Sequence, residues 1–428
     1  MLAAVTPEQS PIDATPTGTK PSQLFLAFMG LTLLFAVFAI YLMTQSLVAP
    51  PSRQLVAAEM PPEQVVIRLK AMSDAERQAL VARERAAVAA DPLDTAALKN
   101  LAALSDVAGD TKRAQDLTLL VGNRSLRDLP VQTAVLQILL ARKDYVGALY
   151  RLDGLIRAKL ERKKELLQVV ASFADGQESL GPLVKLLTQN PPWRQELLLS
   201  MAAEPSQNLN TLYRLLATLR KESTPPTKSE LRAFLQRLVN DKNYDRAYFV
   251  WLDSLSEVEL RRVGLVFDGG FDLDISDLFF DWTYNRLPNV DVSLVPRAPG
   301  SVDRVLRVDF AKGRTPFAHF SQLLRLGPGD YLLSGDARSV DLKNGGGLVW
   351  RIYCLSDQPG PIVESSRLSG TMEWGRFEKP FTVPATNCET QVLRLELNAR
   401  AELDYQISGR AFYDSIAILR REAAPAAQ

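Results

Sequence analysis

The sequence predicts a multidomain α + β chain with one transmembrane helix, a helical region and a C-terminal antiparallel β-sandwich. Three observations predict this fold class: an uncharged apolar run near the start, apolar positions recurring every three or four residues over the next half, and two-residue alternation with Gly, Pro and Asp turns over the remainder. The expected parts are an N-terminal tail (1–23), a transmembrane helix (24–43), a linker (44–57), a helical domain (58–258), a β-sandwich (262–422) and a disordered tail (423–428).

Composition excludes several classes of function. The chain has 428 residues, enough for two or three domains, and a net charge of +1. That charge balance gives no polyelectrolyte signature, so nucleic acid is not an expected partner. The chain has a single histidine, His319, and two cysteines, which excludes a His/Cys zinc site and argues against a Ser-His-Asp relay.

The run from Leu24 to Met43 has twenty residues and no charge. At about 1.5 Å per residue a helix of this length spans about 30 Å, the thickness of a bilayer core. The alternative is a cleavable signal peptide, which needs a basic start. The preceding residues, with Glu8, Asp13 and Lys20, are not basic. We therefore expect an uncleaved anchor that makes the membrane a partner of the chain.

The two cysteines bear on the orientation, because the flanking charges, Lys20 and Arg53, do not decide it. Cys354 and Cys388 lie 34 residues apart in one predicted β-domain. A disulfide between them persists only outside the cytosol, and closing that loop contributes roughly 3 to 4 kcal/mol. Two buried free thiols are the alternative. The expected location is a bacterial inner membrane with the body in the periplasm.

The helical region shows clear start and stop signals. Ser73 with Glu76 and Thr227 with Glu230 form capping-box patterns. Between them, breaks leave segments of about 10 to 18 residues that must pair to bury their apolar faces. The expected breaks lie at Gly109-Asp110, Pro130, Pro182, Pro191-Pro192, Pro205 and Pro225-Pro226.

An internal period accompanies these helices. Superimposing GDTKRAQDL on KDYVGALYRL, at an offset of 34 residues, aligns Ala114 with Ala148, and Ala247 lies 99 residues further on. This period and its alanine resemble tetratricopeptide repeats, although the family's Trp, Gly, Tyr and terminal Pro are mostly absent. The resemblance implies an α-solenoid whose concave surface binds a protein partner. An irregular helical bundle is the alternative.

The C-terminal region predicts about ten short strands in two sheets, of jelly-roll type. Its clearest strands are VLRVDF, HFSQLLRL, YLLSGDARS, GLVWRIYCL, QVLRLELN and FYDSIAILR. Three phrases, LVFDGGFD from Leu265, SQLLRLGPGDY from Ser321 and the Ser408-Gly409…Phe412-x-Asp414-x-Ile416 ending, stand in the order found in carbohydrate-binding modules with a galactose-binding-like jelly roll. The region resembles that family along its whole length.

This resemblance implies two kinds of site. In the family, acidic residues of the first and last phrases share a structural calcium, which places Asp272 and Asp414 as metal ligands here. Glycan binding rests on aromatic rings and on Gln and Arg donors. The candidates are Trp282, Gln322, Arg338, Arg351, Tyr353 and Trp374. Strand alternation favours Arg351 and Tyr353, because it puts Trp350 on the core face and these two on the other.

No phosphate loop, nucleophile elbow or kinase signature is present, so we expect no enzyme. The expected function is a membrane-anchored scaffold whose helical repeats bind a protein and whose jelly roll binds a glycan, in polysaccharide biosynthesis or export. One alternative is a structural envelope assembly factor whose sandwich binds protein. Another is a degenerate glycosidase or esterase.

Overall fold

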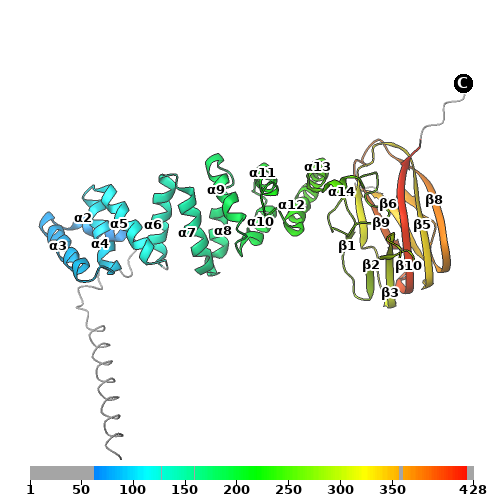
Figure 1. Ribbon diagram of the computed structural model, residues 1–428, viewed down its shortest axis with the longest axis horizontal. Helices are drawn as coiled ribbons and strands as arrows, with labels where there is room; N and C mark the ends of the chain where they lie inside the picture. The colour runs from blue at the N-terminus through cyan, green and yellow to red at the C-terminus, as the bar shows by residue number, and fades with distance from the viewer. Residues whose placement is uncertain (1–61, 127, 159, 356–359, 422–428) are drawn as a thin grey trace, which may run out of the picture. The chain divides into compact units, whose positions relative to one another are not determined.

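The computed structural model describes residues 62–126, 128–158, 160–355 and 360–421. Across these residues the chain is helical as far as Leu260 and is built mainly of strands from Thr283 on (Figure 1). It divides into two compact units, residues 1–144 and 145–428, and each is described by itself. The division falls inside the predicted helical region, so the later helices belong to the same unit as the strands.

The first unit contains five described helices. They are α2 (Pro62–Ala71), α3 (Asp74–Ala90), α4 (Thr95–Val107), α5 (Thr111–Arg124) and α6 (Leu129–Ala141). The predicted capping box of Ser73 and Glu76 opens α3 and is confirmed. Asp94, Asp110 and Asp128 cap the next three helices by accepting from the backbone N–H three residues on. Apolar faces then pack into two buried clusters.

The second unit begins with further short helices. They are α7 (Tyr145–Ala158), η1 (Leu160–Arg162), α8 (Lys163–Ser172), α9 (Gln177–Leu187), α10 (Arg194–Ala203), α11 (Leu209–Arg220), α12 (Lys228–Asn240), α13 (Tyr244–Ser254) and α14 (Glu257–Leu260). Helices two apart in sequence touch: α7 with α9, α8 with α10, α9 with α11 and α10 with α12. Ala148 and Ala247, the predicted small positions of the repeat, are fully buried. Tetratricopeptide-like repeats and a solenoid remain predictions.

Two details of these helices differ from, or add to, the sequence reading. Pro182 is not a break, because it lies inside α9, where it removes one hydrogen bond of the early helix while Leu183 and Leu187 are fully buried. The capping box of Thr227 and Glu230 is confirmed. Glu230 also forms a buried ion pair with Arg194 of α10, at 3.0 Å, which ties α10 to α12.

The predicted location is corrected by the described helices. None of them is long and apolar enough to cross a bilayer, since the longest, α3, has 17 residues and carries several charges. This finding contradicts the assignment as a single-pass inner-membrane protein with a periplasmic body. The run from Leu24 to Met43, the 1–23 tail, the 44–57 linker and the 423–428 tail lie outside the described residues.

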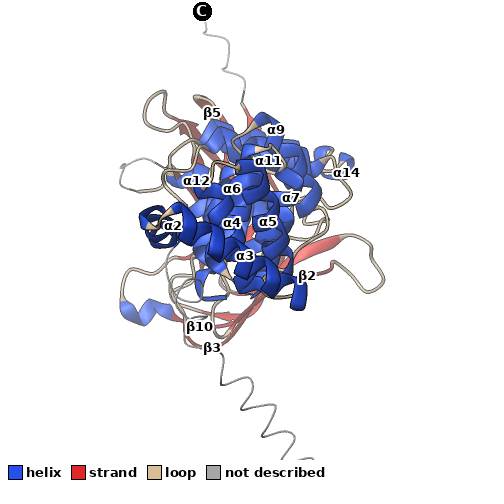
Figure 2. Cartoon of the chain, turned by 90° about the vertical axis from the view of Figure 1, so that its left-hand side faces the viewer, coloured by secondary structure: helices blue, strands red, loops and turns tan. Residues whose placement is uncertain are grey.

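The strands form two five-stranded antiparallel sheets, labelled in Figure 1 and drawn in red in Figure 2. Sheet A has the order β1-β4-β9-β6-β7 and sheet B the order β2-β3-β10-β5-β8. Their bounds are β1 (Thr283–Tyr284), β2 (Val290–Pro296), β3 (Arg304–Arg314), β4 (Phe320–Leu324), β5 (Gly329–Lys343), β6 (Leu348–Cys354), β7 (Val363–Glu364), β8 (Gly370–Val383), β9 (Gln391–Leu397) and β10 (Gln406–Arg420). The two-sheet sandwich is as predicted.

One apolar core fills the space between the sheets. On β6, Leu348, Trp350 and Ile352 point into this core and are fully buried, as alternation predicts. Cys354 and Cys388 form the predicted disulfide, which links β6 to the segment before β9. The disulfide prediction is therefore confirmed.

The opening phrase FDGG packs against the last strand. The Asp268 carboxylate accepts from the N–H groups of Asp272 and Leu273, at 3.2 and 2.9 Å. The Gly269 carbonyl accepts from Ile416 N–H, and a Cβ on Gly269 would lie 1.8 Å from the Ile416 oxygen, so a side chain is excluded there. Burial raises the pKa of Asp268 to about 6, against the lowering effect of those two hydrogen bonds.

Candidate functional site

The six predicted glycan-binding residues lie in three different places in the sandwich. Trp282 and Gln322 lie in the interior, Arg338 and Trp374 on the outer face of sheet B, and Arg351 and Tyr353 on the outer face of sheet A. The outer faces of a sandwich point in opposite directions, so one ligand cannot lie on both. The six predicted residues therefore cannot form one glycan-binding site.

Trp282 and Gln322 are corrected to structural roles. Each is only 1% exposed. The Trp282 ring stacks on Phe320, with centroids 5.0 Å apart, and its Nε1 donates to the Asp268 carbonyl. The Gln322 side chain accepts from Phe267 N–H and donates to the Phe267 carbonyl, both at 2.9 Å. Because both side chains are used inside the fold, neither can contact a glycan.

On the outer face of sheet B, the two predicted residues pack against neighbours. The Arg297 guanidinium lies 4.6 Å from the centre of the half-buried Trp374 ring. Arg338 lies over the Phe412 ring, at 5.7 Å. A ligand would have to displace Arg297 to reach that face of the indole, so Trp374 is a weaker candidate than the sequence suggests.

The predicted calcium ligands pair with different arginines. Asp272 forms an ion pair of 2.7 Å with Arg262, and the buried Asp414 carboxylate pairs with Arg297. Among the residues that the structure describes, no group of three or more His, Cys, Asp or Glu side chains could hold a metal ion. Arginines thus occupy both predicted ligands in this structure, and a calcium ion shared by them stays a prediction.

The outer face of sheet A carries a row of polar side chains across all five strands. The register places Thr283 of β1 opposite Ser321 of β4, Ser321 opposite Arg394 of β9, Arg394 opposite Arg351 of β6, and Arg351 opposite Glu364 of β7. The other face of the same strands is apolar core. Because this polar row faces away from the core, the outer face of sheet A is a candidate binding surface.

A buried carboxylate organises the centre of this face. The Glu396 side chain is 6% exposed and accepts from Tyr353 Oη at 2.6 Å, from Arg351 Nη1 and from Arg394 Nε. Arg351 also donates to Glu364 at 2.7 Å and to Asn398 at 2.6 Å. We call these six residues the Glu396 network. Their bonds hold both guanidinium groups and the phenol in fixed positions before any ligand arrives.

The network also fixes the protonation states of its members. Burial raises the pKa of Glu396, but hydrogen bonds from Tyr353 and Arg351 and the charge of Arg394 outweigh it, so the pKa lies below its usual value. The pKa of Tyr353 is raised, first by burial and then by the Glu396 carboxylate. At neutral pH the centre of the site therefore holds an ionised carboxylate and a neutral phenol.

An apolar row lies beside the polar one. Leu323 of β4, Val392 of β9 and Tyr353 of β6 are cross-strand neighbours and are partly exposed. The Arg394 guanidinium lies 4.6 Å from the centre of the Tyr353 ring. The face thus offers hydrogen-bonding groups and an apolar strip side by side.

Sequence reasoning missed four members of the network: Glu364, Arg394, Glu396 and Asn398. The strand QVLRLELN was identified, and its alternation alone puts Val392, Arg394, Glu396 and Asn398 on one face. The sequence therefore predicts that these four side chains share one face. It does not predict that β9 lies beside β6, because this depends on the strand order of the sheet.

Comparisons with known proteins give structural neighbours only. No family model matches the sequence, and no curated protein matches it. Similar solved structures include a CBM4 module (16% identity, TM-score 0.28, covering 36% of this chain and 99% of that chain) and a family 16 carbohydrate-binding module (18%, 0.26, 37% and 100%). A third is a CBM61 module in complex with β-1,4-galactotriose (15%, 0.25, 37% and 99%). With TM-scores below 0.5, these likenesses carry no argument about the ligand of this protein.

Proposed function

We propose that the sandwich binds a neutral glycan on the outer face of sheet A and does not catalyse a reaction on it. The observation that carries this proposal is the Glu396 network, which holds Arg351, Arg394 and Tyr353 in place across the centre of that face. Side chains fixed in advance lose little entropy on binding, which favours recognition of a weakly interacting ligand such as a sugar.

Charge balance supports a neutral ligand. Two arginines, Arg351 and Arg394, are matched by two carboxylates, Glu364 and Glu396, within ion-pair distance. A polyanion would find no net positive charge in this network, whereas sugar hydroxyls can accept from the guanidinium groups and donate to the carboxylates. The apolar row with Tyr353 matches the C–H face of a sugar ring.

The state of the carboxyl groups supports binding without catalysis. Glycoside hydrolysis needs a general acid whose pKa is raised and a second carboxylate across a cleft. Glu396 has a lowered pKa and is held by three donors. The carboxyls with raised pKa values, Asp268 and Asp281, are buried and accept from backbone N–H groups. None of these groups supports the alternative of a glycosidase.

The other parts of the predicted function remain predictions. No contact among the described helices identifies a protein partner for them, and nothing in the sandwich favours a protein ligand over a glycan. A role in polysaccharide biosynthesis or export likewise stays untested.

A glycan array with the full chain tests the proposal, with Tyr353→Ala as the test variant and Trp374→Ala as the matched control on sheet B. Wild type is expected to bind neutral oligosaccharides. Tyr353→Ala is expected to lose about tenfold or more in affinity, which corresponds to about 1.4 kcal/mol, with Trp374→Ala unchanged. Absence of glycan binding by wild type would overturn the proposal, and loss only in Trp374→Ala would move the site to sheet B. Circular dichroism checks that both variants are folded.

A further inference from the structure

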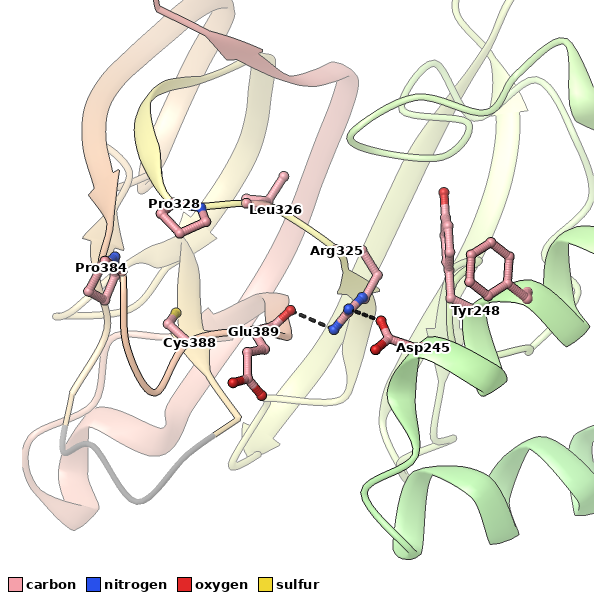
Figure 3. Close-up of a pocket in the computed structure, with 11 residues that line it drawn as sticks. Asp245, Tyr248, Arg325, Leu326, Pro328, Pro384, Cys388 and Glu389 are labelled. Atoms are coloured by element: carbon pink, nitrogen blue, oxygen red, sulfur yellow. Dashed lines mark hydrogen bonds and ion pairs between the residues drawn. The ribbon is translucent and has the colours of Figure 1, made fainter.

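An open pocket of about 370 Å³ lies where helix α13 meets the sandwich (Figure 3). Helix α13 supplies one wall with Asp245, Tyr248 and Phe249, and Pro328 and Pro384 lie on the sandwich side. This volume is within the range of small-ligand sites. The lining of this pocket combines aromatic rings with charged groups, which distinguishes it from the apolar core and from the solvated faces of the helices.

Arg325 joins the two sides of this pocket. Its guanidinium pairs with Asp245 of α13 and donates to the Glu389 carbonyl at 2.6 Å (Figure 3). It also donates to Thr390 Oγ1, at 2.6 Å. Its side chain is 23% exposed, so it is partly open to solvent while being held at three points. Asp245 and Arg325 thus stand as a fixed acceptor and donor at the edge of the pocket.

A buried aromatic cluster fixes α13 against the sandwich. The Trp251 ring contacts Phe267 and Phe280, with centroids 5.1 and 5.7 Å apart, and all three side chains are almost fully buried. Tyr248 meets Phe280 edge-on at 5.1 Å. Phe249, the next residue, is 66% exposed. Because the neighbours of Phe249 anchor α13, the position of its exposed ring is fixed. Packing of the helix does not require this ring to be exposed.

The pocket continues the outer face of sheet A. Arg325 lies two residues beyond Leu323 of β4, and Thr390 two residues before Val392 of β9, so alternation places both on the outer side. At about 3.3 Å per residue, the Arg325 row lies about 7 Å from the row containing Tyr353 and about 13 Å from the row containing Arg394. Thr390 Oγ1 accepts from Arg325, which confirms that the two side chains meet.

We propose that α13 forms a second subsite for the glycan bound on sheet A, so that one oligosaccharide contacts both the sandwich and the last long helix. This inference rests on the proposed function. The rings of Phe249 and Tyr248 would take the apolar face of a sugar, and Asp245 and Arg325 would pair with its hydroxyls. The ligand class is a neutral oligosaccharide long enough to span both subsites, and a short one fills the sheet A site alone.

Titration calorimetry on the full chain tests this with β-1,4-linked oligomers of glucose, xylose and galactose, each as a disaccharide and a hexasaccharide. Wild type is expected to prefer the hexasaccharide by about tenfold or more. Phe249→Ala is expected to remove that preference and leave the disaccharide affinity unchanged. Tyr150→Ala is the matched control, since Tyr150 on α7 is also an exposed aromatic residue, at 73%. This control is expected to behave as wild type.

The outcomes separate the two proposals. If Tyr353→Ala weakens both oligomers and Phe249→Ala weakens neither, the subsite on α13 is wrong and the sheet A site stands. If Phe249→Ala weakens both oligomers equally, the division into two subsites is wrong, because the pocket is then the main site. If wild type binds no oligomer of either length and no neutral glycan on the array, the proposed function falls and the subsite with it.

Discussion

Replacing Glu396 by glutamine tests whether a buried carboxylate organises the outer face of sheet A. The Glu396→Gln side chain keeps its shape but loses the charge that balances Arg351 and Arg394. One carboxylate oxygen, which accepts hydrogen bonds, becomes an NH2 group, which donates them and would face the donors of Tyr353 and the two arginines. We expect the sandwich to lose stability and the two guanidinium groups to lose their fixed positions.

The contacts set the size of this effect. The Glu396 side chain is 6% exposed and accepts three hydrogen bonds, two of them from arginines. A hydrogen bond to a charged group contributes about 1.5 to 3 kcal/mol. Arg351 keeps Glu364 and Asn398, which limits the loss. We expect the free energy of unfolding to fall by about 3 kcal/mol, near the lower end for breaking a buried ion pair. In a domain of about 150 to 250 residues, this loss lowers the melting temperature by about 6 to 12 °C.

Urea unfolding followed by circular dichroism measures the difference, with Glu378→Gln as the matched control. Glu378 lies on a strand of sheet B and pairs with Arg376 at 3.1 Å, with both side chains about half exposed, so its loss should change stability by less than about 1 kcal/mol. Equal midpoints for wild type and Glu396→Gln would show that the carboxylate does not organise the site.

The pH dependence gives a second test of the same residue. Because the folded-state pKa of Glu396 is lowered, its contribution to stability is present above the usual glutamate value of 4.5 and is lost as the pH falls through the folded-state pKa. The difference in unfolding free energy between wild type and Glu396→Gln should therefore shrink below pH 4.5. A difference that grows toward low pH would contradict the assigned charge state.

Three further predictions concern the helices, the opening phrase and the disulfide. Arg194→Met leaves the Glu230 carboxylate, which is 2% exposed, without its partner. We expect the free energy of unfolding, measured with urea, to fall by about 3 to 5 kcal/mol. A fall of less than about 1 kcal/mol would show that water reaches the pair. Asp268 has a pKa raised from 3.8 to about 6, so its contribution to stability is present below pH 3.8 and falls by up to about 3 kcal/mol as the pH rises through about 6. Asp268→Asn should lack this fall, and an unchanged pH profile would contradict the assignment. Reduction of Cys354–Cys388 opens a 34-residue loop and should cost roughly 3 to 4 kcal/mol, whereas a double alanine variant should not respond to reductant in the same unfolding assay.

Local rules in the sequence predicted several features correctly. The capping box of Ser73 and Glu76 needs only residues three apart, and the alternation of β6 needs only neighbours along the strand, so both could be read directly. The change from helices to strands, and the pairing of the two cysteines within the sandwich, followed from the same kind of pattern.

Predictions from local sequence signals were wrong where those signals compete with packing. Trp282 and Gln322 are residue types that bind sugars, yet both are used to hold the opening segment onto β4. Pro182 is a helix breaker by propensity, but the fully buried Leu183 and Leu187 that follow it help to keep α9 continuous despite one lost hydrogen bond. Burial depends on the whole fold, so residue type alone could not give it.

By itself, then, the sequence determined that Arg351 and Tyr353 point away from the core, because the side-chain direction along one strand follows from its pleat. Only the tertiary structure decided what they meet there. The order β4-β9-β6-β7 brings Arg394, Glu396 and Glu364 beside them, and an aromatic cluster around Trp251 sets α13 at the edge of the same face. Strand order and helix docking join residues far apart in sequence, and these long-range contacts are set by the packing of the entire core.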